Sequence, residues 1–96
     1  MYLKQQKILS MNKKEIWSVY LVRCNDNTLY CGISNDVEKR VDKHNSGKGA
    51  RYTSTRGPVI LLYTEPIGTM GQAMKREKQI KRMSKKQKEA LCLRKE

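Results

Sequence analysis

Residues 16–34 read IWSVYLVRCNDNTLYCGIS, in which two runs of β-branched and aromatic residues flank a cluster of turn formers. Such runs are typical of β-strands, and Asn25-Asp26-Asn27 is typical of a tight turn. The stretch therefore predicts a β-hairpin, with strands over 16–24 and 28–34.

The register of this hairpin decides where its tyrosines lie. We place Cys24 opposite Thr28 across a three-residue turn. In this register Tyr20 faces Gly32, which leaves a gap the size of a side chain beside the tyrosine ring. Tyr20 and Tyr30 then lie on one face of the sheet as diagonal neighbours. A shift of one residue would put them on opposite faces, and two ordinary strand tyrosines are the alternative interpretation.

A helix is predicted after the hairpin, over residues 35–47. Asn35 is placed as its N-cap, with Glu38 three residues on, and Gly47 is placed as its left-handed C-cap. The next stretch, GKGARYTSTRG over 47–57, combines glycine, hydroxyl and basic residues. It predicts a loop.

A third strand and two further helices are predicted for the rest of the chain. Residues 58–64, PVILLYT, form a nearly continuous apolar run, typical of a strand buried on both faces. Thr69 with Gln72 forms a capping box and predicts a helix to about residue 83. Ser84 with Gln87 repeats the pattern and predicts a helix to about residue 93. The order ββαβαα indicates a small α/β (α+β) domain, with helices flanking a three-stranded, mainly antiparallel sheet.

The length of 96 residues suits one domain. Residues 1–14 show little periodicity and predict a flexible N-terminal tail, so the single domain is expected over 15–96. No apolar run is long enough to cross a bilayer, and the N-terminus lacks the apolar core of a secretory signal. We therefore expect a cytoplasmic protein that makes no use of a membrane.

The charge of the chain is strongly basic. Lys and Arg number 21 against nine Asp and Glu, which gives a net charge of +12. Such a charge favours a polyanionic partner, nucleic acid before an anionic membrane surface or an acidic protein. Residues 66–96 carry ten basic and three acidic side chains and are the expected electrostatic footprint. A solvated lysine face without a specific partner is the alternative.

The cysteine and histidine content excludes several kinds of site. The chain has three cysteines, Cys24, Cys31 and Cys92, and one histidine, His44. No C-x-x-C pair is present, so a structural zinc site is not expected. Disulfides are rare in cytosolic proteins, and we interpret the cysteines as small buried or half-buried hydrophobic residues.

Glu77 breaks the apolar pattern of the helix that begins near Thr69. It is spaced with Ala73 and Ile80 along the stripe expected to face the core. A buried carboxylate is costly unless a cation or a metal ion accompanies it. A salt bridge to an arginine, a metal ligand and a catalytic carboxylate are the alternatives left open by position alone.

Arg40 and His44 lie one turn apart on the helix over 35–47, on the face that also carries Val37 and Val41. A guanidinium group matches a phosphate, and histidine accepts protons near neutral pH. The two side chains can therefore address one ligand. A hydrogen-bonded structural histidine and an Arg40–Asp36 pair are the alternatives.

Taken together, these residues resemble the GIY-YIG endonuclease superfamily. SVYLV around Tyr20 is similar to its first motif, and LYCGIS around Tyr30 is similar to its second. The helix with Arg40 and His44, the HNSGKGARYT stretch and the inward Glu77 follow in the order of the family. Because it has no flanking domain, the sequence resembles the small stand-alone members of the superfamily, the YhbQ-like branch.

The resemblance implies hydrolysis of a DNA phosphodiester with one divalent ion, Mg²⁺ or Mn²⁺. It implies that Glu77 is the metal ligand and that Arg40 holds the scissile phosphate. Tyr20, Tyr30 and His44 would position and deprotonate the attacking water, with His44 as good a base candidate as a tyrosine. A single carboxylate suits a hard cation that keeps most of its water ligands. We expect the five side chains on one concave surface, with Glu77 near Arg40.

Phosphate contacts are expected from basic residues of the 47–57 loop and of the C-terminal helices. They are Lys48, Arg51, Arg56, Lys75, Lys78, Lys85 and Lys86. With few aromatic residues free to stack on bases, binding should be nonspecific or dependent on DNA structure.

Three functions are therefore weighed from the sequence. The first is a metal-dependent endonuclease acting in DNA repair or processing. The alternative is a noncatalytic nucleic-acid-binding module, for DNA or RNA, which explains the charge of +12 but leaves the inward Glu77 unexplained. A protein-interaction or membrane-surface role comes third.

Overall fold

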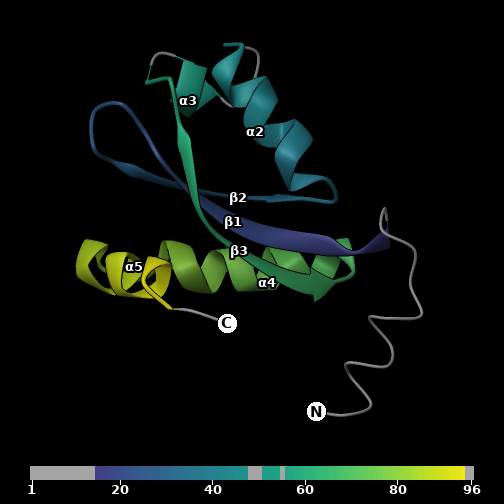
Figure 1. The fold of residues 1–96 in the computed structure, drawn as a ribbon. Coiled ribbons are helices and arrows are strands. Elements are labelled where there is room, and N and C mark those ends of the chain that lie inside the picture. Colours follow the sequence, from purple (N-terminus) through teal and green to yellow (C-terminus); the bar gives the residue numbers. More distant parts are fainter. Residues whose placement is uncertain (1–14, 48–50, 55, 95–96) are drawn as a thin grey trace.

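The computed structural model describes residues 15–47, 51–54 and 56–94. Its centre is a three-stranded antiparallel sheet made of β1 (Trp17–Arg23), β2 (Leu29–Ser34) and β3 (Ile60–Gly68). The strand order is β2-β1-β3, so the first strand of the hairpin is the central one (Figure 1). The predicted tail over 1–14 lies outside the described residues.

The hairpin has the predicted register. Tyr20 pairs with Gly32 and Val22 with Tyr30, and the Cys24 amide donates to the Thr28 carbonyl. Asn27 in the turn adopts φ of 69°, a left-handed conformation that asparagine tolerates better than most residues. Both tyrosines therefore lie on one face of the sheet.

Two pairs of helices cover the two faces of the sheet (Figure 1). On one face lie α2 (Val37–Asn45) and the one-turn helix α3 (Arg51–Ser54), and on the other lie α4 (Met70–Lys81) and α5 (Lys85–Cys92). Apart from the short α3, this is the predicted order ββαβαα. Both predicted capping boxes are present, at Thr69 and at Ser84.

Three sequence-based details were wrong. The N-cap of α2 is Asp36, whose side chain accepts from the Lys39 amide, because the chain enters the helix one residue later than predicted. The expected loop over 47–57 contains α3. The third strand is not buried on both faces: it lies at the sheet edge, and Ile60 keeps 62% of its surface exposed. An apolar run alone does not distinguish a central strand from an edge strand.

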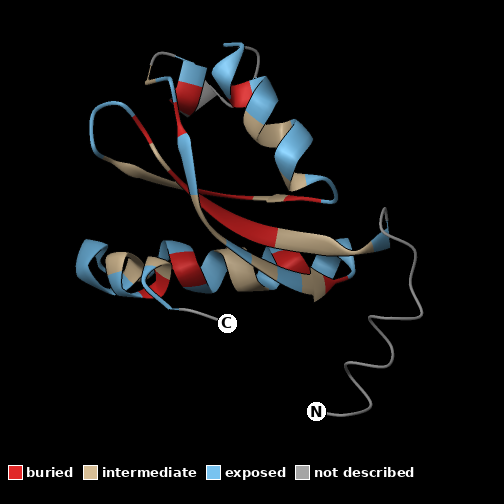
Figure 2. Cartoon of the chain, viewed as in Figure 1, coloured by how far each residue is buried: buried red, intermediate tan, exposed pale blue. Residues whose placement is uncertain are grey.

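The sheet separates two small hydrophobic clusters (Figure 2). Val19, Leu21 and Cys31 pack with Ala73 and Ile80 on the α4 face. On the α2 face, Tyr20, Val22 and Cys24 pack with Val59, and Tyr30, Val37 and Val41 adjoin them. The alternation of β1 side chains between these clusters follows from the period of two in a strand.

The three cysteines are free thiols, with Cys24 and Cys31 buried and Cys92 half-buried. This agrees with their interpretation as small apolar residues. Among the described helices, none combines the length and the apolar character needed to cross a bilayer.

Candidate functional site

A chain of hydrogen bonds links three buried side chains from β1, α2 and α3. The Tyr20 hydroxyl lies 2.9 Å from Nε2 of His44, and Nδ1 of His44 lies 2.5 Å from Oγ1 of Thr53. Tyr20 and His44 each keep 1% of their surface exposed, and Thr53 is fully buried. The three side chains are therefore held in fixed positions relative to one another.

Tyr30 and Arg40 complete the group on this face. The ring of Tyr30 meets the imidazole of His44 edge-on, with centroids 5.5 Å apart. The guanidinium group of Arg40 lies near both Tyr20 and His44, since it lowers the pKa of each. Both side chains are half-buried, so they offer a ligand more surface than Tyr20 and His44 do. The structure thus gathers four of the five predicted residues.

The electrostatics of the group favour neutral forms of Tyr20 and His44. Burial raises the pKa of Tyr20 to about 12, against the opposing effect of the nearby Arg40. Burial and the positive charge of Arg40 lower the pKa of His44, so the imidazole is neutral at pH 7. A neutral imidazole has one nitrogen free of a proton and can therefore accept one.

The burial of His44 changes its expected role. Sequence reasoning treated His44 as a base that acts directly on the attacking water. Both of its ring nitrogens are engaged with Tyr20 and Thr53, and the side chain has almost no contact with solvent. His44 can therefore act on a proton only through the Tyr20 hydroxyl.

Glu77 lies apart from the other four residues. It belongs to α4, which packs on the opposite face of the sheet from α2. Its carboxylate pairs with Nζ of Lys81, one turn on, at 3.3 Å, and not with Arg40 as expected. Burial, followed by the charge of Glu77, raises the pKa of the Cys31 thiol to about 11. Cys31 packs on the α4 face, whereas Tyr20 and Tyr30 lie on the α2 face, so the sheet lies between the carboxylate and the tyrosines.

The donor groups present fit a hydrated divalent ion better than a fully protein-ligated one. Within the described ranges, no three His, Cys, Asp or Glu side chains are grouped to hold a metal ion. The half-exposed Glu77 carboxylate, 20% of whose side chain is accessible, can supply one oxygen ligand. Mg²⁺ commonly binds through one or two carboxylates and keeps several waters.

The predicted phosphate-binding residues fall into separate groups. Lys48, and the side chain of Arg51, lie outside the described part of the chain. Arg56 pairs with Asp26 of the hairpin turn at 3.0 Å. The exposed lysines Lys75, Lys78, Lys85 and Lys86 lie on α4 and α5, the helices on the opposite face of the sheet from His44.

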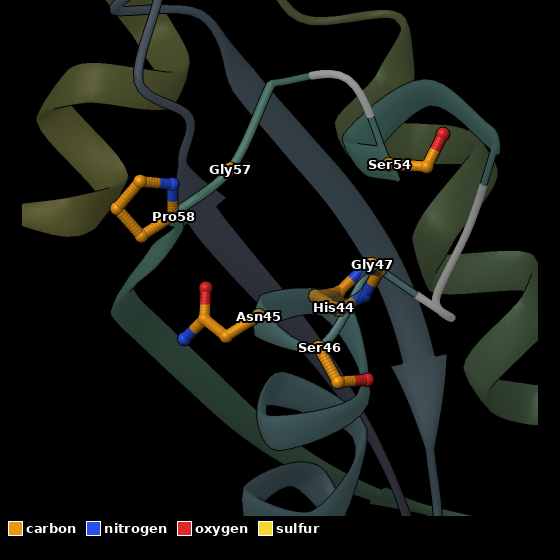
Figure 3. A pocket seen from close by; sticks show the side chains of 7 residues that line it. All are labelled: His44, Asn45, Ser46, Gly47, Ser54, Gly57 and Pro58. Carbon is orange, nitrogen blue, oxygen red and sulfur yellow. The ribbon is translucent and has the colours of Figure 1, made fainter.

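A shallow polar pocket of about 390 Å³ adjoins His44 at the end of α2 (Figure 3). Residues 44–47 line it on one side, and Ser54, Gly57 and Pro58 line it on the other. The Asn45 amide bonds both the N–H and the carbonyl of Val59, which ties α2 to the start of β3. The pocket therefore lies on the α2 face of the sheet, which also carries the two tyrosines.

Thr53 was missed by sequence reasoning. It lies in a stretch interpreted as loop, among hydroxyl and glycine residues without periodicity. No pattern marks one hydroxyl there as the partner of a histidine nine residues earlier. Only the folded chain brings Oγ1 of Thr53 to the imidazole.

Gly32 is required by the position of Tyr20. A Cβ atom on Gly32 would lie 2.5 Å from the Tyr20 hydroxyl oxygen, which is held by His44. We expect Gly32→Ala to lower the free energy of unfolding by roughly 1–3 kcal/mol, because the buried ring has no room to move. Denaturant unfolding, followed by circular dichroism, measures the change.

The matched control for this variant is Gly71→Ala in α4. A Cβ at Gly71 meets nothing within 4 Å, so alanine there should stabilise the helix by about 0.5–1 kcal/mol. Equal stability of Gly32→Ala and the parent protein would contradict the close fit of Tyr20 over Gly32.

Comparison with known proteins finds a matching family model and similar chains. Residues 16–90 match the family model described as the GIY-YIG catalytic domain. A UPF0213 protein of Staphylococcus haemolyticus is 51% identical over 70 residues, which cover 73% of this chain and 85% of that protein. A UPF0213 protein of Nitratidesulfovibrio vulgaris is also 51% identical, over 79 residues covering 82% of this chain and 71% of that protein.

Two solved structures are similar to this fold. The solution NMR structure of a UPF0213 protein from Bacillus halodurans aligns with a TM-score of 0.51 at 41% identity, covering 79% of this chain and 81% of that chain. The solution NMR structure of a protein from E. faecalis aligns with a TM-score of 0.56 at 38% identity, covering 83% and 85%.

Proposed function

The chain belongs to the GIY-YIG family, and from this premise we propose that it is a metal-dependent endonuclease that hydrolyses DNA phosphodiester bonds. The observation that carries the proposal is the Tyr20 hydroxyl, which lies 2.9 Å from Nε2 of a neutral His44 and near the guanidinium group of Arg40. A buried phenol with a proton acceptor on one side and a cation on the other suits proton transfer more than packing.

The side chains on the α2 face can perform proton transfer and phosphate binding. Nε2 of His44 can take the Tyr20 hydroxyl proton as the tyrosine oxygen takes a proton from the attacking water. The water oxygen then forms a bond to phosphorus, and the bond from phosphorus to the leaving oxygen breaks. Arg40 is half-buried near the Tyr20 hydroxyl. Its guanidinium group can bind a phosphate oxygen and stabilise the negative charge that develops there.

Glu77 is proposed as the protein ligand of one divalent ion, Mg²⁺ or Mn²⁺. Such an ion, when bound, polarises the phosphate and stabilises the leaving oxygen. The charge of Glu77 acts on Cys31 in the edge strand β2, and Tyr30 precedes Cys31 in the same strand. A phosphate at the free edge of β2 would therefore lie between the carboxylate and the tyrosines.

The experiment that tests this function is a cleavage assay on supercoiled, linear and branched DNA and on RNA, with Mg²⁺, Mn²⁺ and a chelator. We expect nicking of DNA that requires the metal ion. Binding of nucleic acid without cleavage under all conditions would favour the alternative, a noncatalytic DNA- or RNA-binding module. A role in DNA repair or processing is part of this proposal.

The lysines of α4 and α5 favour nucleic acid as the partner under either function. Lys75, Lys78, Lys85 and Lys86 are exposed. Replacing all four lysines with glutamine should weaken DNA binding, because contacts to phosphates are lost. Each lost contact should also reduce the magnitude of the slope of log affinity against log salt concentration by about 0.9. Fluorescence anisotropy over a salt series measures this slope.

The control for the lysine variant is Met70→Gln with Met74→Gln, which changes two exposed side chains of α4 without changing charge. Its salt slope should match that of the parent protein. An unchanged slope in the four-lysine variant would show that these helices do not contact the DNA.

A further inference from the structure

The imidazole of His44 can adopt either of two neutral tautomers, and its neighbours decide between them. Nε2 faces the Tyr20 hydroxyl at 2.9 Å, and Nδ1 faces Oγ1 of Thr53 at 2.5 Å. A threonine hydroxyl can donate or accept, so the pair with Thr53 alone leaves the tautomer open. The surroundings of Tyr20 supply the missing constraint.

The Tyr20 hydroxyl carries one proton, which needs an acceptor because the side chain is buried. Arg40, the other group within reach of this oxygen, can only donate. Nε2 of His44 is the acceptor that the described residues provide. Nε2 is therefore unprotonated, and the ring proton lies on Nδ1.

We propose that Thr53 is a positioning residue, whose hydroxyl oxygen accepts the hydrogen bond from Nδ1–H of His44 and so keeps Nε2 available to Tyr20. Oγ1 of Thr53 acts through the imidazole and does not touch the substrate. The short helix α3 brings this hydroxyl to the far side of the ring from Tyr20, where it meets no solvent. The effect of Thr53 on the reaction rests on the proposed function, whereas its effect on the tautomer does not.

The chain offers an unusually direct test, because His44 is its single histidine. In a sample labelled with nitrogen-15 at histidine, the side-chain spectrum contains the two ring nitrogens of His44 alone. The parent protein near pH 7.5 should show a protonated Nδ1 and an unprotonated Nε2. The titratable groups that face this ring are Tyr20, Tyr30 and Arg40. Burial raises the pKa of Tyr20 to about 12, so its hydroxyl keeps its proton at that pH. A parent spectrum with the proton on Nε2 would overturn the proposal.

Two variants separate the hydroxyl from the volume of the side chain. Thr53→Val keeps the shape but cannot accept a hydrogen bond. A proton on Nδ1 would then be buried without an acceptor, which offsets the preference set by Tyr20, so the ring proton should move toward Nε2. Thr53→Ser keeps the hydroxyl and should restore the parent spectrum. A folded Thr53→Val protein with the parent tautomer would overturn the proposal. If valine prevents folding, the spectra of the parent and Thr53→Ser proteins decide the question.

Cleavage supplies a second, separable measurement. For a histidine that binds a metal ion, loss of the hydrogen-bond partner on its second nitrogen typically costs about ten- to a hundredfold in activity, and we use the same range for His44. We expect a loss of this size in kcat for Thr53→Val, little change in KM, and recovery in Thr53→Ser. If the parent protein does not cleave DNA but the spectra behave as expected, the proposed function fails and the role of Thr53 in fixing the tautomer stands. A full cleavage rate in Thr53→Val would overturn the positioning role.

Discussion

Replacing Glu77 with glutamine is expected to reduce metal-dependent DNA cleavage by several orders of magnitude while the domain stays folded. The amide keeps the size of the side chain but is a much poorer ligand for Mg²⁺ than a carboxylate. The ion pair that is lost joins Glu77 to Lys81, whose side chain is 53% exposed. Pairs of this kind contribute less than about 1 kcal/mol, so a thermal melt should change little.

DNA affinity should stay level or rise in this variant, because the net charge increases from +12 by one. The matched control is Glu89→Gln on α5, which changes the charge equally but removes an ion pair with Arg23. The control should cleave at the parent rate. Parent-level nicking by a folded Glu77→Gln protein would exclude Glu77 as the metal ligand.

Replacing Tyr20 with phenylalanine is expected to reduce cleavage by about 10²–10⁴-fold, the usual contribution of a positioned acid or base. The variant loses the hydroxyl that lies near Arg40, and it leaves Nε2 of His44 without its partner. A buried polar group without a partner costs about 1–3 kcal/mol, so the free energy of unfolding should also fall. Single-turnover cleavage and denaturant unfolding measure the two effects separately.

The control for this variant is Tyr63→Phe on β3. Burial, followed by the hydrogen bond to Glu65, raises the pKa of Tyr63 to about 12, as burial does for Tyr20. Its hydroxyl donates to Glu65 at 2.5 Å, next to Arg76, and is not part of the His44 group. Tyr63→Phe should therefore lose stability but keep its cleavage rate. Similar rates in the two variants would mean that the Tyr20 hydroxyl has only a structural role.

The hairpin and the helix starts could be predicted from sequence because they depend on local interactions. The turn over 25–27 sets the register, so Tyr20 had to face Gly32 once Cys24 paired with Thr28. Thr69 and Ser84 begin their helices through bonds to residues three positions on. The start of α2 was one residue wrong because two neighbouring residues, Asn35 and Asp36, can both act as caps.

The grouping of Arg40 and His44 with the tyrosines followed from helix periodicity and hairpin register, together with the resemblance to the family. Neither pattern shows how deeply a side chain is buried. The burial of His44, and the contact of its second nitrogen with Thr53 of α3, are seen only in the folded chain. The contact between Thr53 and His44 joins two segments with no shared periodicity.

By itself the sequence determined the pairing of the two hairpin strands, the capping boxes at Thr69 and Ser84 and the basic character of the chain, since each depends on residues near one another or on composition alone. The tertiary structure decided which face of the sheet each helix covers. Periodicity placed Glu77 on the inward stripe of its helix, but a stripe can pack on either face. The packing of α4 against Val19, Leu21 and Cys31 places Glu77 on the opposite face of the sheet from Tyr20. Hydrophobic side chains of β1 point alternately to the two faces of the sheet, so both faces must be covered to bury them. The path of the chain places α2 and α3 on one face and α4 and α5 on the other.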